Sequence, residues 1–325
     1  MIVAGLVFAA LAALLHVYIF WMESLAWDGP QARKTFGVPD SEREATRAFA
    51  FNQGFYNLFL AIAAILGIVE GLTEFLPISS TGHLIITRAL LDLEEQIGFR
   101  QMIVVQGAAI LAVCFEYRAK LWHTARTLHA DPGSRGFALN LFLAFLPAAL
   151  AGLAFEDTIR SVLFAPIPVA MALVIGGVLI LWAEKRPHEE RVRSVDEIRP
   201  LDALRIGLFQ MLALVPGTSR SAATILGGLF TGLDRRTAAE FSFFVAIPVM
   251  FAATGYKLLD AREPLTAGEL QSMLVSGAVA FVSALIAIRF LLRFVSRHSF
   301  AAFAWYRIAL GGFILLSWQQ GWVSW

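Results

Sequence analysis

Two clusters of polar side chains interrupt an otherwise apolar sequence. The first runs Glu70-Gly-Leu-Thr-Glu-Phe-Leu-Pro-Ile-Ser-Ser-Thr-Gly-His83, and the second, Pro216-Gly-Thr-Ser-Arg-Ser221, follows about 140 residues later. Ionisable and hydroxyl groups at membrane depth are costly unless each has a partner, water or a ligand. We therefore interpret the two clusters as the two halves of one active site.

Two carboxylates of the first cluster favour a divalent cation. Glu70 and Glu74 are four residues apart, so both lie on one face of a helix. Two like charges do not both stay ionised in a low-dielectric site without a cation. Mg²⁺ or Ca²⁺, held by both carboxylates and by phosphate oxygens of a ligand, would resolve the conflict. The alternatives are one protonated, packed glutamate, or two glutamates facing a water-filled vestibule.

Three hydroxyl groups and a histidine follow these carboxylates. Ser79, Ser80 and Thr81 occupy the turn after Pro77. Hydroxyl groups in such a turn cap the next helix, or else bind phosphate or attack it as nucleophiles. His83 follows within one helical turn, and beside two glutamates we interpret it as an acid–base group or a nucleophile.

An arginine in the second cluster needs an anion. Arg220 has no acidic residue nearby in sequence and lies in an apolar hairpin, where an unpaired guanidinium would be very costly. Either a glutamate of the first cluster or a ligand phosphate would supply the negative charge, and arginine is suited to bidentate phosphate contact. The helices that leave both turns also direct free backbone N–H groups at the site, which favours phosphate.

The composition places these clusters in a membrane protein. The chain has 325 residues, of which 58% are hydrophobic and 16% charged, whereas soluble domains carry about 25% charged residues. Apolar runs of roughly 18 residues or more recur and predict membrane-spanning helices; we expect the first, Met1–Met22, to be a retained helix because no Lys or Arg precedes it. A single cysteine, Cys114, excludes intrachain disulfides and cysteine-ligated metal clusters. No basic patch with interleaved aromatics indicates a nucleic-acid partner.

Broken helices surround both clusters. Around 70–91 and 203–231, an apolar helix stops at a proline, and a polar turn and a second short helix follow. Neither half is long enough to cross a membrane at ~1.5 Å per residue, and such breaks are tolerated only where they line a cavity. With one residue gapped, the two clusters match as Gly67-x-x-Glu70 with Gly207-x-x-Gln210, and Pro77-x-Ser79-Ser80 with Pro216-x-Thr218-Ser219. We therefore predict an all-α polytopic fold with inverted repeats, two re-entrant helix–turn–helix pairs and a midplane site.

Loop charges predict the orientation of these pairs. Segments 118–135, 184–205 and 289–307 are rich in Lys and Arg, which places them on the cytoplasmic side. Segments 92–100 and 156–165 are short and lean towards acidic residues, so we expect them on the opposite side. The first broken pair then enters from outside and the second from the cytoplasm.

Both clusters resemble the signatures of the undecaprenyl-pyrophosphate phosphatases, the bacitracin-resistance membrane phosphatases. Phe241–Pro248 and Ser299–Arg307 look like further blocks of that family, and the similarity covers about residues 58–325. One departure is Ala222, where the family usually has glycine. The resemblance implies hydrolysis of undecaprenyl diphosphate to undecaprenyl phosphate and inorganic phosphate, which recycles the carrier for cell-wall synthesis and confers bacitracin resistance. It also implies a divalent cation and a multi-pass protein of the bacterial cytoplasmic membrane, with its site open to the outer side.

The same resemblance implies roles for the matching residues. The catalytic set comprises Glu70, Glu74, Ser79, Ser80, His83 and Arg220, and the two glutamates would also hold the metal. The phosphate-binding set comprises Thr81, Thr218, Ser219 and Ser221. A hydroxyl, His83 and water all remain open as the attacking group. The expected partners are the polyprenyl diphosphate substrate, membrane lipids and a second copy of the chain, and the alternative function is a transporter or flippase of a phosphorylated lipid.

Residues 1–57 lie outside that pattern. His16-x-x-Ile-Phe20, Glu23 and Phe51–Asn57 resemble the first half of a small uncharacterised family of bacterial four-helix membrane proteins. We therefore divide the chain into an N-terminal membrane extension, 1–57, and a phosphatase domain, 58–325, joined naturally or artificially near Leu58–Ile65. Because Glu70 and Glu74 need one helical face, we predict an unbroken helix over 48–76, with loop 24–48 on the outer side.

Overall fold

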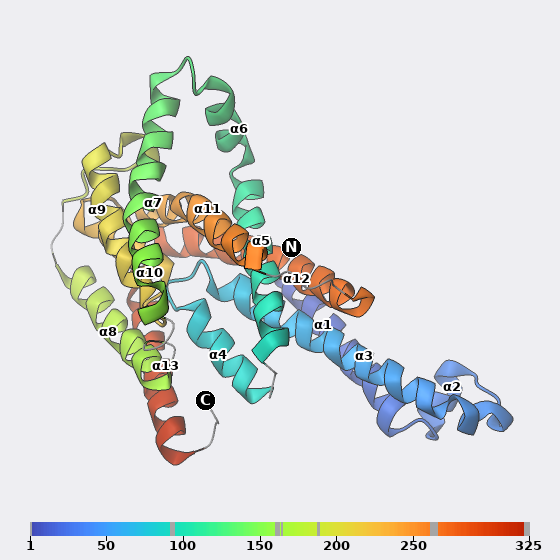
Figure 1. Ribbon diagram of the computed structural model, residues 1–325. Helices are drawn as coiled ribbons and strands as arrows, with labels where there is room; N and C mark the ends of the chain where they lie inside the picture. Colours follow the sequence, from blue (N-terminus) through green and yellow to red (C-terminus); the bar gives the residue numbers. More distant parts are fainter. Residues whose placement is uncertain are drawn as a thin grey trace.

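The computed structural model describes residues 2–91, 95–159, 163, 165–186, 189–260 and 266–321. Within these ranges the regular structure is helical, apart from one isolated bridge between Val192 and Leu233. The α-helices (Figure 1) are α1 (Ile2–Phe20), α2 (Pro30–Phe36), α3 (Asp40–Thr73), α4 (Ser80–Leu90), α5 (Glu95–Glu116), α6 (Arg118–Thr127), α7 (Pro132–Thr158), α8 (Pro166–Lys185), α9 (Pro200–Gln210), α10 (Arg220–Phe230), α11 (Arg235–Asp260), α12 (Ala267–Val295) and α13 (Ala301–Gln320). Short helices of other types are η1 (Trp21–Leu25), η3 (Val195–Glu197) and η4 (Met211–Leu214).

Six of the described helices are long and apolar enough to cross a membrane. They are α3, α7, α8, α11, α12 and α13. Two bent helix pairs are also long and apolar enough to cross a membrane when each pair is counted as one span. They are Ala10–Leu25 with Pro30–Phe36, and Gln101–Glu116 with Arg118–Thr127. The prediction of an all-α polytopic membrane protein is therefore confirmed.

The N-terminal extension forms a helical hairpin that projects from the body of the molecule (Figure 1). In it α1 packs along α3, and a small separate core of Met22, Trp27, Ala32 and Ala50 closes its outer end. Helix α3 runs without a break from Asp40 to Thr73, so its 34 residues span about 51 Å. The predicted unbroken helix is confirmed, and it begins eight residues earlier than expected.

Small residues allow α3 to pack closely on α12. A methyl group added at Gly71 would lie 2.7 Å from Ser283 Cβ and 2.8 Å from the backbone nitrogen of Ala284. Gly67, one helical turn earlier, likewise lies against the backbone of Ser276. Glycines four residues apart are a common means of bringing two membrane helices into contact. This contact fixes the end of α3 that carries Glu70.

The second half of the chain repeats the element order of the first. Ser80 and Arg220 begin α4 and α10, and Glu95 and Arg235 begin α5 and α11, a separation of 140 residues in both cases. Contacts cross between the halves, because α3 packs on α12 and α9 packs on α7. The structure thus supports an internal repeat in which each half packs a helix against the other half.

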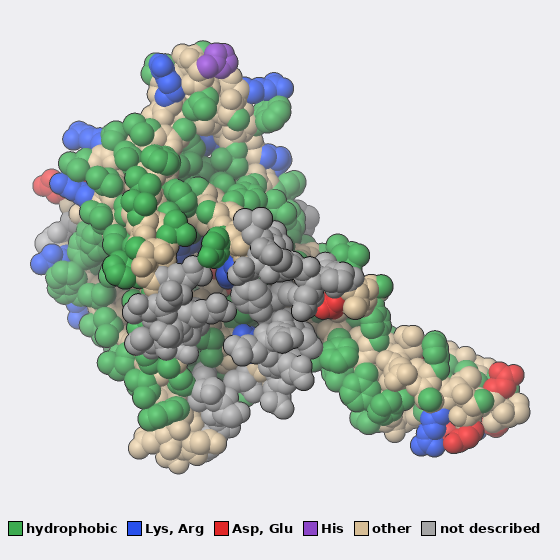
Figure 2. Space-filling model, viewed as in Figure 1, with side chains coloured by type: hydrophobic (Ala, Val, Ile, Leu, Met, Phe, Trp, Pro, Cys, Tyr) green, Lys and Arg blue, Asp and Glu red, His purple; other side chains and the backbone are tan. Residues whose placement is uncertain are grey.

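Charged side chains gather at two ends of the molecule. Figure 2 shows hydrophobic side chains over most of the visible face, with basic groups around α6 and mixed charges at the projecting tip around α2. An apolar surface of this kind suits lipid contact. Figure 2 also shows charged groups at the left edge of the molecule, and the predicted placement of segment 118–135 and loop 24–48 on opposite sides stays a prediction.

Candidate active site

The two polar clusters form two turns with the same unusual backbone geometry. Ser79 and Ser219 have positive φ angles of 71° and 72°, a strained region for residues other than glycine. Each side chain accepts a hydrogen bond of 3.3 Å from the backbone nitrogen three residues later, that of Gly82 or of Ala222. The buried Ala222, which departs from the family pattern, therefore keeps the capping hydrogen bond.

This geometry corrects the predicted pairing of the two clusters by one residue. The gapped match paired Ser79 with Thr218, but the backbone angles pair Ser79 with Ser219. The separation is then 140 residues, the same as between Gly67 and Gly207 in the sequence match. The two turns thus correspond without a gap, and Arg220 occupies the position equivalent to Ser80.

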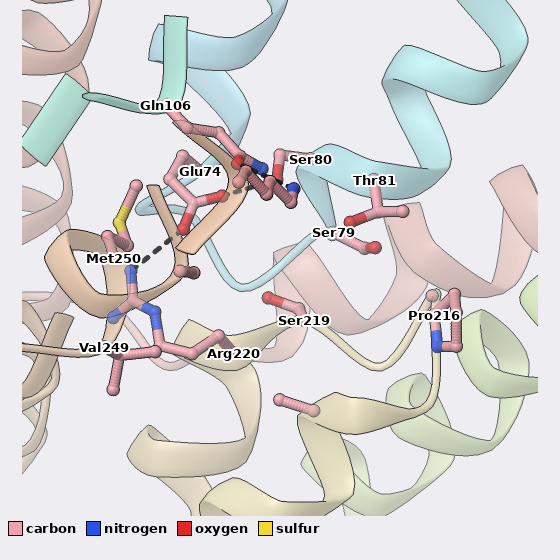
Figure 3. A pocket seen from close by; sticks show the side chains of 14 residues that line it. Glu74, Ser79, Ser80, Thr81, Gln106, Pro216, Ser219, Arg220, Val249 and Met250 are labelled. Carbon is pink, nitrogen blue, oxygen red and sulfur yellow. Dashed lines mark hydrogen bonds and ion pairs between the residues drawn. The ribbon is translucent and has the colours of Figure 1, made fainter. Parts of the chain in front are cut away.

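A cavity of about 190 Å³ lies between the two turns (Figure 3). From the turns themselves it is lined by Glu74, Ser79, Ser80, Thr81, Pro216, Gly217, Ser219 and Arg220. Ala213, Gln106, Val249, Met250, Ala253 and Lys257 complete the lining. The structure therefore brings six of the predicted site residues to one cavity, three hydroxyl groups of the first turn among them.

An ion pair joins the two turns across this cavity. The Nη2 atom of Arg220 lies 3.2 Å from Glu74 Oε1, and each of these two side chains is only 11% exposed. Ser80 Oγ donates to the other oxygen of Glu74 at 2.5 Å, and Arg220 Nη1 donates to the carbonyl of Ser242 at 2.8 Å. Glu74 thus supplies the negative charge that Arg220 needs, and its contacts join residues of both clusters.

Glu70 does not line the cavity. Its side chain is fully buried, and neither carboxylate oxygen accepts a hydrogen bond from any residue that the structure describes. A buried carboxylate without a partner indicates a missing cation or proton. No group of three or more His, Cys, Asp and Glu side chains lies together in the described ranges. A Mg²⁺ or Ca²⁺ ion at Glu70 and Glu74 would need phosphate oxygens and water as its other ligands, and the predicted metal stays a prediction.

His83 does not line the cavity. Its Nδ1 atom lies 2.7 Å from the carbonyl oxygen of Ser79, and its Nε2 atom lies 2.7 Å from the hydroxyl of Tyr306. The two rings also stack with centroids 5.5 Å apart. A ring protonated at Nδ1 would donate to Ser79 and accept from Tyr306. His83 therefore holds the strained residue of the first turn, and its predicted catalytic role stays a prediction.

Two of the four predicted phosphate-binding residues lie outside the cavity lining. Thr81 and Ser219 line it, whereas Thr218 and Ser221 do not. Ser221 is fully buried; its hydroxyl donates to the Leu76 carbonyl at 2.9 Å and lies 2.9 Å from Ser219 Oγ. The observed contacts of Ser221 therefore tie the second turn to the first.

Arg307 was counted with the basic segment 289–307 that we expected on the cytoplasmic side, and this expectation is wrong for Arg307. Its guanidinium group is fully buried in α13, where among the described residues it donates to backbone carbonyls. The acceptors are those of Pro77 in the first turn, Gly217 and Thr218 in the second, and Ala172 and Leu173 in α8, at 2.8–3.3 Å. One side chain thus fixes both turns against α8. The argument applied to Arg220, a guanidinium in an apolar helix without a nearby acid, would also have found Arg307.

Comparisons with known proteins show the family of the chain. Residues 63–313 match the family described as bacitracin resistance protein BacA, and residues 10–115 match a protein family of unknown function, DUF1304. The "Undecaprenyl-diphosphatase" of Laribacter hongkongensis is 54% identical over 268 residues, which are 82% of this chain and 98% of the relative. The "Undecaprenyl-diphosphatase 2" of Rhodospirillum rubrum is 55% identical over 269 residues, again 82% and 98%. The second family match supports the separate resemblance of the N-terminal segment. This chain belongs to the bacitracin resistance protein BacA family.

Proposed function

We propose that the chain hydrolyses undecaprenyl diphosphate to undecaprenyl phosphate and inorganic phosphate in the bacterial cytoplasmic membrane. The observation that carries the proposal is the ion pair between Glu74 and Arg220, set among hydroxyl groups of both turns in a cavity between apolar helices. The names of the relatives support the same activity. In the reaction, the bond between the bridging oxygen and the terminal phosphorus breaks, and the oxygen of water ends in the released phosphate.

The two turns are arranged to hold the terminal phosphate. Helices α4 and α10 begin at these turns, and the free N–H groups and positive dipole ends of helix N-termini favour anions. Ser79, Thr81 and Ser219 add hydroxyl donors from the cavity wall. Arg220 supplies a guanidinium that stabilises the charge developing on the phosphate oxygens.

Glu74 is placed to handle a proton. Ser80 Oγ donates to Glu74 Oε2 at 2.5 Å, so this carboxylate would accept a proton from Ser80 or from a water in its place. Glu70 and Glu74 would hold the divalent cation, which when bound neutralises phosphate charge and polarises the phosphorus centre. The buried, unpartnered oxygens of Glu70 support this assignment.

The apolar wall of the cavity accounts for a lipid substrate. Val249, Met250 and Ala253 of α11 form an apolar part of the cavity lining, in contrast to the hydroxyl groups of the turns. The start of a polyprenyl chain buried there would lose contact with water, which is favourable at roughly 25 cal/mol per Å² of apolar surface. The cavity thus offers one wall for the headgroup and another for the chain.

Phosphate release by the purified protein tests the proposal. In detergent, undecaprenyl diphosphate should yield phosphate with Mg²⁺ or Ca²⁺ and none with EDTA. Glu74→Gln should abolish release, whereas Glu240→Gln, a matched change outside the cavity, should not. No phosphate release by the metal-supplied protein, together with movement of the intact lipid across vesicles, would reject hydrolysis in favour of transport.

A further inference from the structure

One face of α11 lines the cavity from Val249 to Lys257. Val249, Met250, Ala253 and Lys257 all line the cavity, and their spacing of one, three and four residues keeps them on one side of the helix. Met250 is buried and Ala253 is exposed. Lys257, one turn further along, is half-buried.

Lys257 and Gln106 meet at this wall. Lys257 Nζ lies 3.5 Å from Gln106 Oε1, and both residues line the cavity. Gln106 belongs to α5 and Lys257 to α11, so neither comes from the two turns. The pair offers an ammonium group and an amide to a ligand that reaches this side of the cavity.

The charges of the site leave a role for this lysine. Glu70, Glu74 and Arg220 together carry a formal charge of −1 when ionised, and Arg220 is already paired with Glu74. A diphosphate headgroup brings further negative charge, and like charges at close range repel strongly away from bulk water. Lys257, which interacts electrostatically with Glu70, and the divalent cation proposed above bring the formal charge of the site to +2, opposite in sign to the headgroup.

The orientation of the lipid substrate in the cavity determines which of its two phosphates lies near Lys257. The terminal phosphate belongs where the hydroxyl groups and Arg220 meet, and the prenyl chain belongs on the apolar wall of α11. The phosphate that carries the chain lies next to the terminal phosphate along the lipid. On the α5–α11 side the cavity supplies two polar groups that do not come from the turns, Gln106 and Lys257, and these would contact it.

We propose that Lys257, supported by Gln106, forms a second phosphate subsite that binds the phosphate retained in the lipid product. This inference rests on the proposed hydrolysis and assigns its substrate contacts: Arg220 and the turns hold the phosphate that leaves, and Lys257 holds the phosphate that stays. Inorganic phosphate should then bind without Lys257, whereas a lipid monophosphate should need it.

Inhibition by the two products tests this assignment. Lys257→Met should raise the KM for undecaprenyl diphosphate about tenfold or more, the effect of losing one charge-assisted hydrogen bond, and change kcat by less than about threefold. The inhibition constant of undecaprenyl phosphate should rise by a similar factor, and that of inorganic phosphate should stay the same. Lys257→Arg should restore most of the affinity. Lys185→Met, an exposed lysine outside the cavity, is the matched control.

Three results would overturn the assignment. Unchanged KM and inhibition constants in Lys257→Met would show that the lysine makes no substrate contact. An equal loss of affinity for inorganic phosphate would place Lys257 at the terminal phosphate instead. A variant that melts earlier in detergent and loses kcat without a change in KM would show a structural role. Phosphate release by the unmodified protein separately decides whether hydrolysis itself stands.

Discussion

Replacing Gly176 by alanine would test whether Arg307 holds the two turns in place. The added methyl carbon would overlap Nη2 of Arg307 and lie 2.8 Å from its Cζ atom, so the guanidinium must move away from α8. Its Nη2 atom donates to the carbonyls of Ala172 and Gly217, both at 3.1 Å. Each hydrogen bond from a charged group contributes about 1.5–3 kcal/mol, so losing both would cost about 3–6 kcal/mol. The better helix propensity of alanine offsets about 1 kcal/mol of this loss.

We therefore expect Gly176→Ala to lower the free energy of unfolding by about 2–5 kcal/mol. Thermal melting in detergent measures this change, and phosphate release below the melting range reports the displacement of Gly217 in the second turn. Gly312→Ala on α13 is the control, because no atom lies within 4 Å of its added methyl group; it should melt at or slightly above the temperature of the unmodified protein. If Gly176→Ala melts at the same temperature as this control and keeps full turnover, the hydrogen bonds from Arg307 to the five backbone carbonyls do not hold the two turns, and the reasoning fails.

Four further predictions concern the site and the extension. Glu74→Gln, His83→Ala and Arg220→Ala should each lower turnover at least ~10²-fold, the scale of one catalytic or charge-stabilising group, measured on protein that remains folded in detergent; an Arg220→Ala protein that is unstable yet active would show a purely structural ion pair. Ser221→Ala should cost about 1 kcal/mol of stability through the lost bond to Leu76 and leave KM unchanged, whereas a raised KM would return Ser221 to phosphate binding. Chelation should abolish phosphate release, and Mg²⁺ or Ca²⁺ should restore it; activity that persists in EDTA would exclude a metal at Glu70. A cysteine placed at Ser41 should react with an impermeant reagent in intact cells, and labelling only after permeabilisation would reverse the predicted topology.

Some of the site could be predicted because polar groups in apolar sequence have few structural uses. Glu74, Ser80 and Arg220 were expected together on that ground, and they form one hydrogen-bonded set in the structure. The unbroken helix α3 followed from the need to keep Glu70 and Glu74 on one face. In both cases the free-energy cost of burying a polar group predicted the structure better than local helix propensity did.

Other features depend on the conformation of the folded chain and were not predictable from residue types. A serine gives no sign that its φ angle is positive, so the pairing of Ser79 with Ser219 needed the backbone. The direction of His83 is set by Tyr306, more than 200 residues away. Helix α6 was expected as a basic loop, because its polar sequence lacks the apolar face on which prediction relies. Residues 92–94 and 160–162, within two of the segments assigned to the outer side, lie outside the described residues.

The continuity of α3 has a mechanical consequence. The helix carries Ala50, in the core of the projecting hairpin, and Glu70, beside the catalytic cavity, on a single rod with no joint between them. A helix resists twisting about its axis because every turn is hydrogen-bonded to the next. A torque that a bound molecule applied to the hairpin would therefore travel along α3 to the contact with α12 that fixes Glu70, so the extension is mechanically coupled to the position of this buried carboxylate.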